Sequence, residues 1–172
     1  VGDLAQGVYG NAGHSSSTHG YATGGQTVNS AGPRYNNIQK FSFSSDGNAT
    51  DSADLALAIF DAGGTSSETH GYSAGGNKGG SPYQTKDIQK FPFASATNAS
   101  DIGDMLYVTA ALFGTTSSTH CYWGGGHDGY PPGNAYNNQI EKLPHATDGN
   151  STDVGNLTEN RRCWGGAQSS SY

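Results

Sequence analysis

One short motif recurs along this chain at a spacing close to 50 residues, and this period constrains the fold more than any other feature. The motif reads Ser-Ser-Thr-His-Gly-Tyr and is followed by a Gly-Gly pair, as residues 16–25 show. Its copies place His19, His70 and His120 at intervals of 51 and 50 residues. Self-similarity at a fixed period is the signature of a repeat architecture, in which each repeat is one unit that packs on the next. We therefore expect a single repeat array over residues 1–172, with a partial repeat at 1–18 and repeats at 19–69, 70–119 and 120–171.

Each repeat also contains a run in which apolar and polar residues alternate, the pattern of a half-buried strand. These runs cover residues 38–43, 88–93 and, in a degraded copy, 140–145. The chain holds 27 Gly among 172 residues and has no long segment of helical period, so helical repeats are unfavourable. A period near 50 with several short strands and glycine-rich turns predicts an all-β fold of propeller blades, each with four antiparallel strands. A β-helix or a loose β-array is the alternative.

The order of these elements resembles the Kelch repeat family. The repeat pattern has, in order, Tyr, two residues, Gly-Gly, a spacer, an amphipathic strand, an Asp-Gly-Asn-Ala-Thr-Asp turn and Leu. This variety of the repeat is similar to that of uncharacterised proteins of aquatic microbes and viruses. The resemblance covers nearly the whole chain and implies a Kelch-like β-propeller with about three and a half repeats. The outer-strand Trp common in Kelch blades is missing, since Trp123 and Trp164 lie elsewhere, and the copper-and-radical apparatus of Kelch oxidases is not recognisable. Propellers host many activities, so the likeness implies fold more than function.

Charge and hydropathy exclude several classes of partner. The chain has 8 Lys and Arg against 14 Asp and Glu, and no basic stripe that could neutralise nucleic-acid phosphates. No apolar run approaches the ~18 residues that a membrane-spanning helix needs. Val1 begins in ordinary sequence without a signal-peptide pattern, as in a mature or trimmed chain. Cys121 and Cys163 form no close-set metal motif; they are a candidate disulfide, with two buried thiols as the alternative.

The polar residues that recur at one repeat position are interpreted as structural. We expect the three motif histidines to be buried and hydrogen-bonded at equivalent positions, because buried polar groups must find partners. The aspartates that close each Asp-Gly-Asn turn recur as well and join this predicted hydrogen-bond network. A channel of metal-binding or catalytic histidines is the alternative. The predicted network comprises His19, His70, His120, Asp51, Asp101 and Asp153.

The same turn carries two further candidate functions. Asn48, Asn98 and Asn150 each begin an Asn-x-Ser/Thr sequon, and we expect them to be exposed acceptors for N-glycosylation. Asp46 and Asp148 offer hard oxygen ligands of the kind that Ca²⁺ takes, but the turn lacks the ligand count of a dedicated site. We therefore predict no required cofactor, with calcium as a weak candidate.

The connections after each Gly pair vary most between repeats, and loops on a rigid scaffold are where binding usually resides. Their aromatic and polar residues suit sugar rings, although solvated loops with incidental aromatics are an equal alternative. The candidate ligand residues are Arg34, Tyr35, Tyr83, His127, Asp128, Tyr130 and Tyr136.

The sequence favours a non-enzymatic repeat protein located outside the cell or on a virion or cell surface, with a structural, adhesive or fibre-forming role. A carbohydrate-binding host-recognition module is the first alternative, and a hydrolase or oxidase built on a propeller is the second. Residues 154–172 repeat residues 1–19 in register, so we expect that the chain does not close a ring alone. Its expected partners are other copies of itself, further repeats of a parent chain, or glycans.

Overall fold

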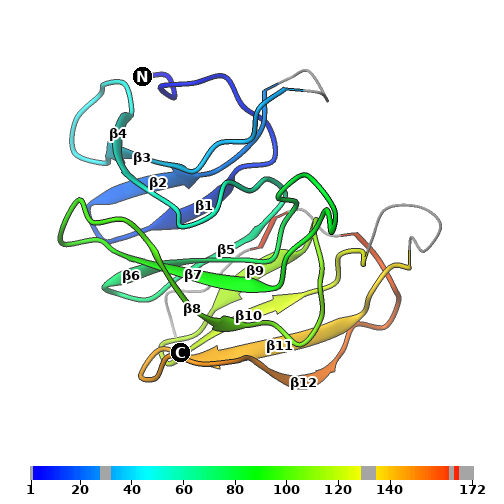
Figure 1. The fold of residues 1–172 in the computed structure, drawn as a ribbon. Helices are drawn as coiled ribbons and strands as arrows, with labels where there is room; N and C mark the ends of the chain where they lie inside the picture. The colour runs from blue at the N-terminus through cyan, green and yellow to red at the C-terminus, as the bar shows by residue number, and fades with distance from the viewer. Residues whose placement is uncertain (1, 28–31, 129–134, 163–164, 167–172) are drawn as a thin grey trace.

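The computed structural model describes residues 2–27, 32–128, 135–162 and 165–166, and within them the chain is all-β. The strands form three four-stranded antiparallel sheets, and no helix occurs among the described residues (Figure 1). None of these residues therefore belongs to a helix that could cross a membrane. The first sheet contains β1 (Ala12–Ser15), β2 (His19–Thr23), β3 (Asn37–Ser42) and β4 (Thr50–Asp54). The second contains β5 (Gly63–Ser66), β6 (His70–Ala74), β7 (Asp87–Pro92) and β8 (Ser100–Asp104). The third contains β9 (Phe113–Thr116), β10 (His120–Gly124), β11 (Gln139–Pro144) and β12 (Thr152–Asn156).

Within each sheet, strands that are consecutive in sequence lie side by side. The motif strand pairs with the Ile-Gln-Lys strand, as predicted: Tyr21 faces Lys40 in the first sheet and Tyr72 faces Lys90 in the second. Each sheet starts one strand before the motif histidine, so the sheets cover residues 12–54, 63–104 and 113–156. Repeat boundaries placed at the histidines therefore separate each sheet's first strand from the other three.

The Ser-Ser-Thr-His motif is a turn between the first two strands of each sheet. Ser16 Oγ accepts hydrogen bonds from the backbone N–H groups of Thr18 and His19, at 3.3 and 3.0 Å. The backbone of the turn closes with Ser16 N–H donating to His19 C=O at 2.9 Å. Ser hydroxyls favour turns because they can replace a backbone partner in this way. Ser67 and Ser117 repeat the arrangement in the other two sheets.

The Gly-Gly pair that ends the second strand is required by the backbone. Gly75 has φ 63° and Gly76 has φ 101°, both in the region that glycine alone visits at little cost. A Cβ on Gly75 would lie 2.6 Å from the carbonyl oxygen of Thr109, in the connection to the third sheet. The pair thus allows the end of one sheet to approach the start of the next.

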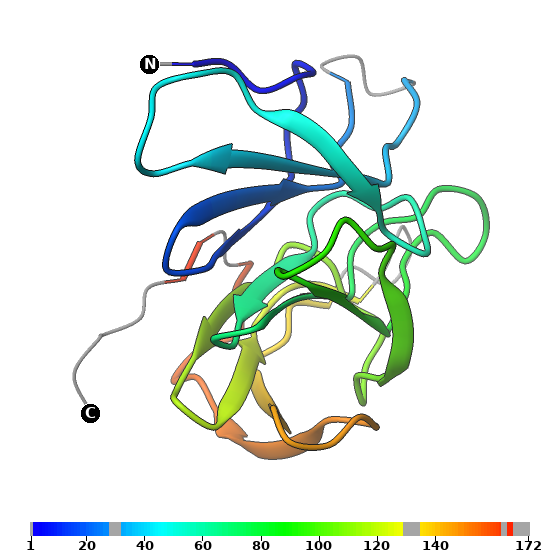
Figure 2. The same cartoon turned by 90° about the vertical axis from the view of Figure 1, so that its left-hand side faces the viewer.

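The first strands of the sheets stack directly on one another, β1 against β5 and β5 against β9. Viewed from the hairpin side, the three sheets spread from the side of the molecule where these strands lie (Figure 2). Glycine allows the stacking: a Cβ on Gly64 would lie 2.5 Å from Gly13 O, and one on Gly114 would lie 2.1 Å from Gly64 O. Gly166 continues the series against Gly114.

The hydrophobic core lies between sheets rather than within any one of them. The first cluster joins Tyr21, Ile38 and Leu55 of the first sheet and its connection to Phe91 and Ala99 of the second. The second cluster joins the second sheet to the third in the same manner. Because each cluster buries apolar side chains from two successive sheets, the repeats stabilise one another. The buried members of the second cluster are Tyr72, Ala74, Ile88, Met105, Leu112, Cys121, Trp123 and Leu143.

Candidate functional site

The contact surface between successive sheets, here called the joint, gathers most of the residues that recur in the repeat. In the first joint the ring of Tyr21 stacks on Phe93, with centroids 4.7 Å apart, and meets the edge of Phe91 at 5.7 Å. The ammonium group of Lys40 lies over the Tyr21 ring, with Nζ 5.8 Å from the ring centroid. The motif tyrosine is therefore held between a cation of its own sheet and aromatic rings of the next one.

The second joint has the same plan with different residues. Tyr72 stacks on His145 at 5.8 Å, where the first joint uses phenylalanine, and Lys90 lies 5.9 Å from the Tyr72 centroid. Lys90 also forms an ion pair with Asp148 of the third sheet, with Nζ and Oδ1 2.8 Å apart. Partial burial, together with the charge of Lys90, lowers the pKa of His145, so the stacked ring is neutral near pH 7.

The sequon asparagines fix the outer edge of each joint. Asn98 Oδ1 accepts the backbone N–H of Asp54 at 3.0 Å, and Asn150 Oδ1 accepts that of Asp104 at 3.0 Å. Asn48 makes the same contact with Asp3. All three asparagines are exposed, as predicted for the turns that hold them. Asn98 and Asn150 therefore tie the third-to-fourth-strand turn of one sheet to the end of the outer strand of the preceding sheet, and Asn48 ties its turn to the N-terminal segment.

Sequence reasoning did not single out the polar residue that is buried at the same strand position of each sheet. Gln39, Gln89 and Glu141 are no more than 3% exposed, and the last two lie at the centres of the two joints. A register shift beside each of them turns two successive residues inward. Gln89 Oε1 accepts the backbone N–H of Leu57 at 2.8 Å, and Glu141 accepts that of Leu106 at 2.9 Å. A polar side chain repeated at one strand position was the available signal.

His14 is a second buried polar group that the repeat pattern could not reveal, because the other repeats carry Thr65 and Thr115 there. Its Nδ1 lies 2.9 Å from the carbonyl oxygen of Thr65, which can only accept, so Nδ1 carries the proton. Its Nε2 lies 3.0 Å from Thr23 Oγ1 and 3.2 Å from Ser73 Oγ, and it accepts a hydrogen bond from this pair of hydroxyls, which also bond to each other at 2.9 Å. Burial lowers the pKa of His14 to about 4, so the ring joins the first two sheets as a neutral group.

The first sheet presents an uncovered copy of the joint. Phe41 and Phe43 stand at the positions of Phe91 and Phe93, yet they are 37% and 56% exposed, whereas Phe91 is 2% exposed. A cavity of about 310 Å³ lies beside Phe41, lined also by Ser42, Ser45, Asp46 and residues 2–4. The equivalent space in the first joint, where Tyr21 is inserted, measures only about 30 Å³. The cavity therefore lies on the first sheet at the position that corresponds to the place of the motif tyrosine in the internal joints.

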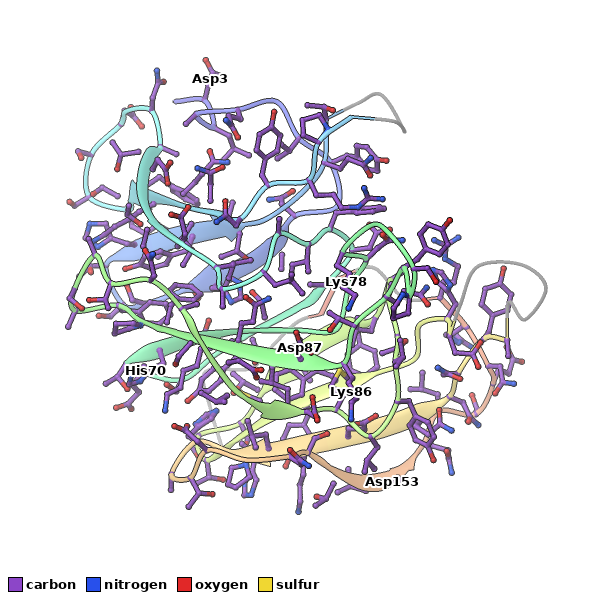
Figure 3. The ribbon with its side chains drawn as sticks, in the orientation of Figure 1. Asp3, His70, Lys78, Lys86, Asp87 and Asp153 are labelled. Atoms are coloured by element: carbon purple, nitrogen blue, oxygen red, sulfur yellow. The ribbon has the colours of Figure 1, made fainter. Side chains whose placement is uncertain are left out.

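The motif histidines do not occupy the buried positions that we predicted. His19, His70 and His120 are half-buried, because each begins its strand directly after an exposed hairpin turn. Each Nδ1 lies 2.8 Å from Oγ1 of the preceding threonine. His70 lies at the hairpin end of the molecule, away from Lys78 in one of the variable loops (Figure 3). Partial burial and the nearby Lys90 lower the pKa of His70.

The recurring aspartates lie on the outer strands, and no hydrogen bond joins them to the motif histidines among the described residues. Asp101 Oδ1 accepts the N–H of Gly103 at 3.1 Å, and Asp153 Oδ1 accepts that of Gly155 at 2.9 Å. Asp51 accepts the side-chain amide of Asn37. These carboxylates thus hold the irregular outer strand locally rather than forming one network with the histidines.

The candidate ligand loops gather at the end of the molecule opposite the hairpin turns, at the right of Figure 1. The guanidinium of Arg34 lies 5.2 Å from the Phe60 centroid, and its Nε donates to Asn77 Oδ1 at 3.3 Å. His127 Nδ1 lies 3.1 Å from Gln84 Nε2. These two contacts join neighbouring sheets. Tyr83 and Tyr136 are exposed, Tyr35 is half-buried, Asp128 accepts the backbone N–H of Ala135, and Tyr130 lies outside the described residues.

The remaining candidates are placed as follows. Cys121 is fully buried on β10, and burial raises the pKa of its thiol to about 12, while Cys163 lies outside the described residues. The calcium candidate Asp148 is the partner of Lys90, and Asp46 lines the cavity beside Phe41. Within the part of the chain that the structure describes, no three His, Cys, Asp or Glu side chains gather closely enough to hold a metal ion.

No protein-family model matches this chain, and no curated protein sequence is significantly similar to it.

Proposed function

We propose that this chain is a non-catalytic repeat scaffold of Kelch-like propeller blades, with a structural or adhesive role outside the cell or on a particle surface. The observation that carries the proposal is the joint, which occurs twice with the same parts: a stacked tyrosine, an asparagine bond and a buried Gln or Glu. In both joints, the recurring asparagine and the buried Gln or Glu bond to the backbone of the neighbouring sheet or its connection. Residues that recur for this reason are a device for adding one unit to another.

Three arguments support propeller blades over the other β-arrays. Each sheet has four antiparallel strands in sequential order, the arrangement of a blade. The first strands stack on one another through Gly13, Gly64 and Gly114, as blade strands do around a central axis. The chain then passes from the outer strand of one sheet to the first strand of the next, through connections that include Leu55 and Met105.

The scaffold proposal is tested by inserting one extra unit. A duplicate of residues 55–104 placed after Asp104 keeps the repeat register, because Leu55 and Met105 occupy equivalent positions. If the units are interchangeable blades, the longer chain folds with a higher unfolding midpoint than the original and the same strand content per residue. A duplicated chain that is unfolded or less stable, as measured by circular dichroism and urea titration, would contradict the proposal.

Carbohydrate binding at the loop end is a second candidate function. Tyr83 and Tyr136 are exposed, and the contacts of Arg34 with Asn77 and of Gln84 with His127 join the neighbouring loops. Exposed aromatics beside hydrogen-bonding groups suit sugar rings. A glycan array tests this: Tyr83→Ala should abolish any signal, whereas Glu68→Ala, on an exposed turn at the hairpin end, should retain it. Absence of a signal from the original chain would remove this candidate.

A further inference from the structure

From the uncovered copy of the joint we propose that the first sheet binds the third sheet of a second copy of this chain, with Tyr122 of that copy entering the cavity beside Phe41. The inference rests on the proposed repeat scaffold and names its partner. Tyr122 stands at the repeat position of Tyr21 and Tyr72, which fill the two internal joints. Head-to-tail contact of this kind is heterologous, so it builds closed rings or open filaments.

The size of the cavity supports a tyrosine as its occupant. The space beside Phe41 measures about 310 Å³, against about 30 Å³ beside Phe91, where Tyr21 is already present. One wall of each cavity is formed by equivalent residues: Phe41, Ser42 and Ser45 line the open cavity, and Phe91, Pro92 and Ser95 line the filled one. An incoming tyrosine would cover Phe43, whose ring is 56% exposed in the single chain.

The charges of the two surfaces also match. In the second joint Lys90, which lies over the motif tyrosine, pairs with Asp148 of the next sheet at 2.8 Å. The corresponding lysine of the third sheet is Lys142, and the corresponding aspartate of the first sheet is Asp46, which lines the cavity. The docked pair would therefore repeat the ion pair of the second joint. In the first joint this pair is missing, because Ala96 takes the aspartate's place.

Docking of this kind exchanges equivalent segments. Gly2-Asp3-Leu4 lies on the first sheet, where Asp3 meets Asn48 and the N–H of Ala5 meets Gln39. In the incoming copy Gly155-Asn156-Leu157 follows the same pattern and would take the same place. Gly166 of the incoming copy, which stacks on Gly114, would likewise be displaced by Gly13 of the receiving copy. The contacts that the displaced segments lose are replaced by equivalent contacts with the other copy. The burial of Tyr122 and Phe43 is then the net gain in stability. Exchange of identical elements is a low-cost route to assembly.

Gly13 provides a variant that tests docking without disturbing the single chain. A Cβ at Gly13 meets nothing within 4 Å, whereas one at Gly64 would lie 2.5 Å from the neighbouring backbone oxygen. Gly13→Ala should therefore fold normally and block the receiving surface. Tyr122→Ser should block the incoming surface, and Phe43→Ser weakens the receiving one. Tyr83→Ser, a similarly exposed aromatic at the loop end, is the matched control.

Sedimentation velocity over a range of protein concentrations measures the outcome. We expect the original chain and Tyr83→Ser to associate, and Gly13→Ala and Tyr122→Ser each to associate at least about tenfold more weakly. Mixing these two variants should yield dimers and nothing larger, because each supplies one intact surface. A monomeric original chain, undiminished association of Gly13→Ala, or equal loss in Tyr83→Ser would overturn the docking. The insertion of an extra unit measures folding alone. The repeat-scaffold proposal can therefore be supported by that experiment even if the two copies do not dock.

Discussion

The hydroxyl of Ser151 donates a hydrogen bond to the carboxylate of Glu141, and both side chains are buried in the joint between the second and third sheets. The other two repeats carry glutamine and alanine at these positions, as Gln89 and Ala99 show. The third repeat has thus changed both residues together. A buried carboxylate needs more hydrogen-bond donors than a buried amide does, and the serine supplies one.

This pairing predicts a non-additive mutant cycle. Ser151→Ala leaves the Glu141 carboxylate with the N–H of Leu106 and should lower the unfolding free energy by about 2 kcal/mol, the scale of a bond to a charged group. The double variant Glu141→Gln with Ser151→Ala restores the Gln and Ala of the other joints. Its stability should return to within about 0.5 kcal/mol of the original chain, a coupling typical of residues in contact. Urea unfolding measures all four proteins, and additive losses would contradict the pairing.

The stacking of the first strands predicts opposite responses at two equivalent glycines. Gly64→Ala places a Cβ 2.5 Å from Gly13 O, so it forces the sheets apart and should cost about 1–3 kcal/mol, as overpacking does. Gly13→Ala meets open space and should be neutral or stabilise by up to about 1 kcal/mol, because alanine has less conformational freedom when unfolded. Thermal unfolding compares the pair. Similar losses at both positions would show that backbone flexibility, and not close packing, accounts for the glycine that recurs at this repeat position.

The sequence predicted those parts of the fold that local chemistry determines. The three antiparallel sheets, the hairpin turns and the pairing of the motif strand with the Ile-Gln-Lys strand follow from period, turn residues and alternation. Burial was predicted less well, because it depends on the neighbouring sheet. Gln89 was not singled out by the sequence pattern, yet a register shift beside it buries both Ile88 and Gln89. His70 was expected to be buried, yet its strand starts at the exposed hairpin end.

The candidate site could be predicted only where it repeats. The exposed turns at the sequon asparagines were found because all three copies share them. His14 was missed because Thr65 and Thr115 replace it in the other repeats, so no period marks it. The joint was missed as a unit because its two halves, such as Tyr21 and Phe93, are 72 residues apart, and only tertiary packing brings them together.

His14 predicts a loss of stability on mild acidification. Its pKa is about 4 in the folded chain and ordinarily 6.5, so the unfolded chain binds the proton more tightly. The stability that neutral His14 contributes is present in full above pH 6.5 and decreases as the pH falls from 6.5 to 4. At pH 5 the unfolding free energy should have fallen by about 2 kcal/mol. His14→Thr, the residue of the second repeat, should remove this part of the pH dependence. Urea midpoints at pH 7.5 and 5 test it, and an equal acid loss in His14→Thr would assign the effect to other groups.

The sequon asparagines predict that a glycan and a structural bond can share one side chain. The glycan attaches to Nδ2, whereas the joint uses Oδ1 of Asn98 to accept the N–H of Asp54. Asn98→Ala should therefore lower the unfolding free energy by about 1 kcal/mol, while Asn98→Asp keeps an acceptor oxygen and should lose less. Expression in a glycosylating host supplies the third arm: the modified protein, identified by its mass, should unfold at the same urea concentration as the bare chain or a higher one. A modified protein as unstable as Asn98→Ala would mean that the glycan breaks the hydrogen bond to Asp54. The turn could then carry a glycan or form part of the joint, but not both.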